Sequence, residues 1–154
     1  MTLDWNHEAL DQLKWHFDLH VRPRLEGLTD DEYFWRPAAP PVTTIAWRLG
    51  HVIVGVFGDR SASHFGAPKV SYAPDEWPPD ASTALAALDA GYATWTAGVA
   101  ALGDEGMRRP VGPAEGPWHE SPMGALVMHI NREAIHHLAE VLLLRDLYRA
   151  RSGA

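Results

Sequence analysis

Residues 121–151 read SPMGALVMHINREAIHHLAEVLLLRDLYRAR, and this stretch predicts one long helix. Its apolar residues recur at spacings of three and four, which is the period of an amphipathic helix. Ser121 followed by Pro122 is typical of an N-cap and a first helical position. On a helical wheel the buried stripe consists of Leu126, Ile130, Val141, Leu144 and Tyr148. The last turns carry cations that suit the negative end of a helix dipole, namely Arg145, Arg149 and Arg151.

Three further segments are long enough for helices, and helical spacing fits them better than strand alternation. They cover residues 3–25, 43–65 and 82–102. The first of them carries its own core stripe, formed by Leu10, Leu13, Phe17 and Val21. Thr29 and Glu32 match a capping box, which predicts a short helix start after the first segment.

Proline and glycine cluster between these segments, in residues 36–41, 66–79 and 103–122. Such clusters mark connections, and these are longer than an idealised up-and-down bundle requires. We therefore predict an all-α fold, a four-helix bundle with long connections that can wall a pocket at one end. The whole chain, residues 1–154, is expected to form this single metal-binding domain.

Composition and charge exclude several classes of partner. With 13 Lys and Arg against 20 Asp and Glu, the formal net charge is -7, which argues against binding to nucleic acid or to an anionic membrane surface. No apolar run is long enough to span a membrane and no signal peptide is recognisable, so we expect a cytoplasmic protein. The chain contains no cysteine, so any thiol chemistry needs a thiol carried on a small molecule.

Glu133 and His137 place a carboxylate and an imidazole at i and i+4 on the face of the last helix that should be apolar. An unpaired buried carboxylate is costly, so Glu133 must be protonated, paired or bound to a cation. The spacing suits two ligands of one metal ion. From this helix alone, a Glu133–His137 hydrogen bond without metal is the simpler explanation.

His51 lies on a second apolar face, which it shares with Trp47, Val54, Gly55, Gly58 and Ala62. The two glycines lie one and two turns beyond His51, where missing side chains would leave space. A single histidine there is more often a core residue bonded to a carbonyl, but metal sites in bundles are commonly built from Glu and His on facing helices. His51, Glu133 and His137 would form a set with one open coordination position, which is the pattern of a catalytic zinc site.

The other polar residues carry weaker signals. Three that adjoin the Glu133 face are either contacts to the ligands and substrate or surface residues: His129, Arg132 and His136. Three on the first helical segment are expected to be solvated: His7, His16 and His20. Two are either pocket residues or exposed: His64 and His119. The chain has no nucleophile elbow and no nucleotide-binding glycine loop, so no residue is assigned as catalytic.

Three stretches resemble the DinB-like superfamily of four-helix metalloproteins. They are HVRPRLEGLTDDEYFWRP (residues 20–37), TTIAWRLGHV (residues 43–52) and HINREAIHHLAEVLLLRDLY (residues 129–148). The resemblance implies three metal ligands, one His on the second helix and an i,i+4 pair on the fourth, which here are His51, Glu133 and His137. A Glu in place of the usual His at position 133 resembles the metal domain of mycothiol-dependent maleylpyruvate isomerase, which binds zinc.

The resemblance also implies a chemistry, because the superfamily includes bacillithiol and mycothiol S-transferases and the metal domain of sulfoxide synthases. We expect no counterpart of the isomerase's C-terminal domain, and therefore a thiol S-transferase that acts on an electrophilic small-molecule substrate. Zn²⁺ is the expected metal, although Ni²⁺, Fe²⁺ and Mn²⁺ accept the same donors. Mycothiol or another low-molecular-weight thiol would be the co-substrate. The alternatives are a metal-dependent hydrolase and a non-catalytic metal-binding stress-response protein, which could be a homodimer.

Overall fold

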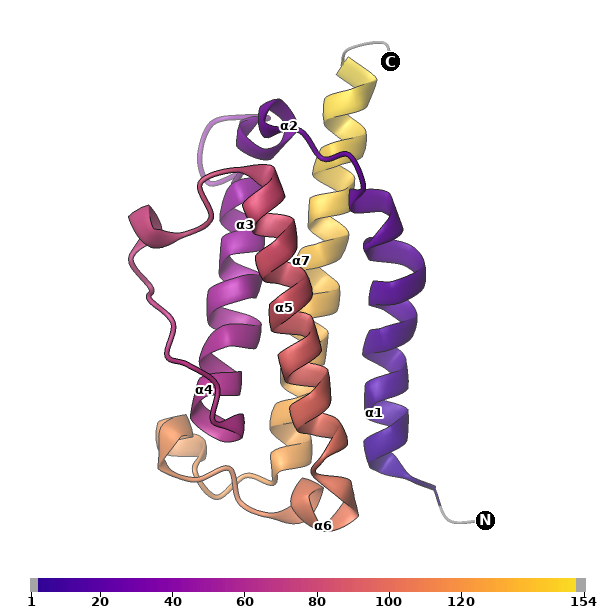
Figure 1. Cartoon of the computed structure of the whole chain (residues 1–154), viewed down its shortest axis with the longest axis vertical. Coiled ribbons are helices and arrows are strands. Elements are labelled where there is room, and N and C mark those ends of the chain that lie inside the picture. The colour runs from indigo at the N-terminus through magenta and orange to yellow at the C-terminus, as the bar shows by residue number, and fades with distance from the viewer. Residues whose placement is uncertain (1–2, 152–154) are drawn as a thin grey trace.

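Four long helical rods run side by side in the computed structural model, which describes residues 3–151 (Figure 1). The first rod consists of α1 (Trp5–Lys14) and the π-helical segment η1 (Trp15–Val21). The second consists of α3 (Ile45–His51), the π-helical segment η3 (Val52–Gly58) and α4 (Asp59–Phe65). The third and fourth are α5 (Ala81–Ala100) and α7 (Met123–Arg151). The part of the chain that is described contains no β-strand, so the predicted all-α bundle is confirmed.

Shorter helices lie at the ends of the bundle and in its connections. They are η2 (Pro23–Leu25), α2 (Asp30–Phe34), η4 (Pro74–Glu76), α6 (Gly103–Arg108) and η5 (Pro113–Trp118). Because α7 begins at Met123, Pro122 precedes the helix and does not occupy its first position. The two ends of the predicted domain, residues 1–2 and 152–154, lie outside the described residues. None of the described helices is long and apolar enough to cross a membrane.

The first and fourth rods run parallel to each other and antiparallel to the second and third (Figure 1). Two contacts give the parallel direction: Asn131 Nδ2 donates to the Ala9 carbonyl at 2.8 Å, and Arg24 contacts Asp146 at 2.7 Å. The second and third rods are neighbours that point the same way, so the chain must return along the bundle between them. This return explains the long connection at residues 66–80, which runs along the outside of α3 and α4 (Figure 1).

Residues 67–80 of this connection, called the strap from here on, pack against the second rod at two glycines. A Cβ atom on Gly50 would lie 2.1 Å from Cε3 of Trp77, and one on Gly58 would lie 2.7 Å from Cγ1 of Val70. The space expected at Gly58 is therefore not open. That expectation was wrong because the strap folds back over this face and its side chains fill the gap.

The core agrees with the predicted stripes except at Tyr148, which is half-buried near the end of α7. Leu13, Phe17 and Val21 are buried in the first rod, and Leu10 packs against them half-buried. The last helix buries the predicted residues Leu126, Ile130, Val141 and Leu144. A buried amide links three rods, because Asn131 accepts a 3.3 Å hydrogen bond from Trp95 Nε1 and donates to Ala9. Satisfying this amide on both sides removes the cost of burying it.

Two π-helical segments change which side chains face inward. In η1 the Arg22 amide donates to the Phe17 carbonyl, and the Asp59 amide that closes η3 donates to the Val54 carbonyl, five residues back in each case. This wider winding shifts later residues from the positions of a regular wheel. His16, expected to be solvated, is half-buried beside the backbone of α7, so that expectation was wrong.

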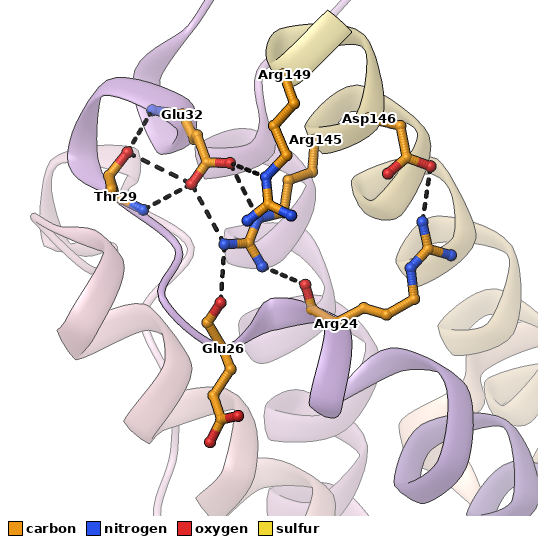
Figure 2. Close-up of polar contacts among 7 residues, drawn as sticks. All are labelled: Arg24, Glu26, Thr29, Glu32, Arg145, Asp146 and Arg149. Carbon is orange, nitrogen blue, oxygen red and sulfur yellow. Dashed lines mark hydrogen bonds and ion pairs between the residues drawn. The ribbon is translucent and has the colours of Figure 1, made fainter. Parts of the chain in front are cut away.

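Glu32 joins α2 to the end of α7 (Figure 2). The Glu32 amide donates to Thr29 Oγ1 at 3.2 Å and the Thr29 amide donates to Glu32 Oε2 at 2.9 Å, which confirms the capping box. Arg145 Nε and Arg149 Nε also donate to Glu32 Oε1, at 3.0 and 3.1 Å. Arg145 is buried and pairs with Glu32, so it links α7 to α2 in addition to complementing the helix dipole.

The charge of Glu32 is stabilised by these contacts. Burial raises the pKa of Glu32, but the hydrogen bonds from Arg145, the Thr29 amide and Arg149 outweigh this effect and hold the pKa below its ordinary value. Removing the carboxylate would leave the Arg145 charge buried without its partner, which typically costs about 3–5 kcal/mol.

Candidate metal centre

Three polar side chains from two rods meet halfway along the bundle. His51 is the last residue of α3, and Glu133 and His137 lie one turn apart on α7. One possible ligand atom from each residue lies within 4.8 Å of the other two. The structure therefore brings together the three residues that the sequence singled out, although α3 and α7 are far apart in the chain.

The donor atoms lie close to the spacing that a metal ion requires. His137 Nε2 lies 3.6 Å from Glu133 Oε2. The ring centroids of His51 and His137 are 4.7 Å apart, with the ring planes at 83°. Two ligands of a tetrahedral zinc ion with bonds of about 2.0–2.1 Å are separated by about 3.3 Å. The distance of 3.6 Å between His137 Nε2 and Glu133 Oε2 is close to this value, and two imidazoles with one carboxylate are a donor set that zinc accepts.

The cluster is accessible from solvent. The side chain of His137 is 15% exposed and that of Glu133 is 32% exposed. Structural zinc sites are closed by four protein ligands, whereas catalytic sites keep one position for water or substrate. Within residues 3–151 the cluster contains three donors, a number that would leave one position of a tetrahedral ion open.

The surroundings of His51 orient its ring and favour its neutral form. Trp47 stacks on the ring with centroids 5.4 Å apart and planes at 9°. A Cβ on Gly55 would lie 3.3 Å from Nδ1 of His51 and 3.7 Å from the Tyr72 ring of the strap. Burial lowers the pKa of His51, the neighbouring His137 lowers it further, and Glu133 offsets part of the effect. The neutral imidazole that results is the form that coordinates metal ions.

A fourth residue, Glu140, orients His137 and was missed by the sequence reasoning. His137 Nδ1 donates to Glu140 Oε2 at 2.9 Å, which directs Nε2 toward Glu133. Arg48 of α3 contacts the same carboxylate and fixes it in turn. Histidines that bind metals almost always donate their second N–H to such an acceptor. The signal in the sequence was a carboxylate three residues after His137 on the same helix.

Glu140 also belongs to a second group of potential donors, together with His136 and His137. His136 Nε2 lies 3.4 Å from Glu140 Oε1, but its side chain is mostly exposed. Because Glu140 is already engaged by Arg48, a cation there would meet a neighbouring positive charge. The donor chemistry therefore favours the group formed with His51.

Of the remaining polar candidates, two lie beside Glu133 and the others lie elsewhere. His129 and Arg132 are exposed on α7, and Nδ1 of His129 and Nε of Arg132 each lie 3.8 Å from Glu133 Oε1. The side chain of His64 is only 4% exposed, and its Nε2 lies 2.8 Å from Glu115 Oε1. His119 is exposed, as are His7 and His20.

Comparison with known families gives an independent result. A family model described as the DinB superfamily matches residues 20–141, which is most of the chain and includes the three clustered residues. Comparisons with curated proteins and with solved structures find no significant match.

Proposed function

The chain belongs to the DinB superfamily, and on this basis we propose that it is a metal-dependent S-transferase that joins a low-molecular-weight thiol, of the mycothiol type, to an electrophilic small molecule. His51, Glu133 and His137 would hold the metal ion, with Zn²⁺ as the first choice. The chain itself has no cysteine, so the sulfur must come from the co-substrate.

One observation carries this proposal: three neutral or anionic donors converge from two helices and remain partly open to solvent. A purely structural site would be closed by a fourth protein ligand. A Glu133–His137 hydrogen bond alone would not require His51 to face both residues. The arrangement of all three residues is better explained by a shared cation.

In the proposed reaction the sulfur of the thiol forms a bond to an electrophilic carbon. The leaving group departs with its electron pair, and the thiol proton passes to solvent. A divalent cation in the site would lower the pKa of a coordinated thiol. Glu140 keeps the Nδ1 proton on His137, so that the unprotonated Nε2 stays available as a metal ligand. Arg48 holds Glu140 in place.

The first test is metal content, measured by plasma mass spectrometry on protein purified without added metal or chelator. We expect about one divalent ion per chain, lost in His51→Ala with the helical circular dichroism retained. His7→Ala, an exposed histidine on α1, is the matched control and should keep its metal. Unchanged metal content in His51→Ala would contradict the ligand assignment.

The second test is thiol transfer to monochlorobimane, with mycothiol, bacillithiol, glutathione and cysteine compared as donors. Thioether formation above the uncatalysed rate, lost in His51→Ala, would support the transferase. Ester hydrolysis without any thiol would indicate the metal-dependent hydrolase. Metal binding without turnover of either kind would favour the non-catalytic metal-binding protein.

A further inference from the structure

A cavity next to the three clustered residues has the size and walls of a site for a small apolar molecule. Its volume is about 420 Å³, within the range of about 300–1,000 Å³ that is usual for ligand sites. Its apolar walls come from the connection before α7 and from the first turn of α7 itself: Val111, Trp118, Ala125 and Leu126. The long connection thus walls a pocket, as expected from its length.

The exposure of the Trp118 side chain is the observation that points to a ligand. It lines the cavity, yet it is 71% exposed. An indole ring carries a large apolar area, and leaving it in water forgoes the free energy that its burial would provide. A molecule seated in the cavity would cover this ring.

The walls are held in place by contacts within the chain. The Val111 amide donates to the Ser121 carbonyl at 2.9 Å, which closes the connection on itself. Glu115 accepts a 2.8 Å hydrogen bond from His64 Nε2, and these two side chains are only 10% and 4% exposed. The buried contact ties the connection to α4. Preformed walls of this kind are typical of small-molecule sites.

The polar groups of the cavity favour a neutral occupant. Arg60 Nη1 lies 2.8 Å from Asp59 and 3.5 Å from Glu115, so two carboxylates already balance its charge. His129 lines the cavity, and its Nδ1 lies 3.8 Å from Glu133 Oε1. The cavity is therefore a direct neighbour of the candidate metal centre.

We propose that this cavity binds the neutral, mostly apolar body of the electrophilic substrate. The hydrophilic thiol is excluded from it and approaches the metal centre from the solvent side. The inference rests on the proposed function for the role of the occupant. Binding itself requires neither metal nor thiol, so it can be measured separately from turnover.

The test uses two fluorescent probes with the same ring system, neutral 2-naphthol and anionic 2-naphthoate, and metal-free protein. Ala125→Trp fills the cavity from an exposed position on α7, and Ala139→Trp adds the same side chain at another exposed position of that helix. We expect 2-naphthol to bind, with its Kd raised at least tenfold in Ala125→Trp and changed less than twofold in Ala139→Trp. Naphthoate should bind at least fivefold more weakly than naphthol.

Trp118→Ala is a second variant, which weakens naphthol binding at least threefold without adding bulk to α7. Failure of naphthol to bind, or equal binding in Ala125→Trp and wild type, would overturn the proposal, and so would equal affinity for the two probes. Naphthol binding that survives His51→Ala while thiol transfer is lost would confirm that the cavity and the metal centre are separate parts of one site.

Discussion

Replacing Glu140 by Gln tests the geometry of the candidate metal centre most directly. The substitution keeps the size of the side chain but removes the charge that accepts the 2.9 Å hydrogen bond from His137 Nδ1. It also removes the anionic partner of Arg48, whose charge would then repel a bound cation. Both effects weaken metal binding while leaving His51, Glu133 and His137 present.

The expected size follows from what such acceptors contribute in metalloproteins. Losing the partner of a metal-binding histidine costs about 10- to 100-fold in affinity, which corresponds to about 1.4–2.7 kcal/mol. Glu140→Gln should lie at the lower end, because an amide oxygen still accepts a hydrogen bond from Nδ1, and Glu140→Ala should lie at the upper end.

The assay is competition for zinc against a chromophoric chelator of known affinity. Asp146→Asn is the matched control, since Asp146 is an exposed carboxylate on the same helix that pairs with Arg24. Circular dichroism and Tm establish that each variant is folded. Zinc affinity of folded Glu140→Gln within twofold of wild type would refute the role of Glu140, and an equal loss in Asp146→Asn would show that the effect is unspecific.

Three further predictions concern stability. Glu32→Gln should lower the free energy of unfolding by about 3–5 kcal/mol, because it leaves buried Arg145 without its carboxylate. The control Asp31→Asn, at an exposed position, should change it by less than about 0.5 kcal/mol. Urea titration measures both values. The stabilisation that Glu32 contributes to the folded state should be fully present above the ordinary glutamate pKa of about 4.3. It should be lost as the pH falls through the lower pKa of Glu32 in the folded protein. In an acid titration, Glu32→Gln should lack this part of the pH dependence of stability. Gly50→Ala should cost about 1–3 kcal/mol by driving a methyl group into the Trp77 ring, and its Tm should recover when Trp77 is also replaced by Leu.

Local periodicity made the helices and the ligand pair predictable. Most of the buried face of the last helix could be assigned because spacing along a regular helix determines which side chains share a face. Glu133 and His137 follow from the same rule, since i,i+4 neighbours are close whatever the rest of the fold does. Thr29 and Glu32 were recognisable because a capping box is complete within four residues.

The same rule failed where the helices depart from regular winding. The π-helical turn of η1 is not visible in the spacing of apolar residues, and the partial burial of His16 beside α7 was not predicted either. The filled space at Gly58 could not be predicted either, because the side chain that occupies it, Val70, arrives from the strap.

The helical class of the chain, its core stripes and the pairing of Glu133 with His137 follow from local spacing alone. The packing of the helices was needed to show that His51 faces this pair, that Arg48 fixes Glu140, and that the cavity reaches His129 beside Glu133. These contacts join residues that are far apart in the chain. Contacts within a helix follow from its fixed rise and turn, whereas contacts between α3 and α7 depend on how every helix in the bundle packs.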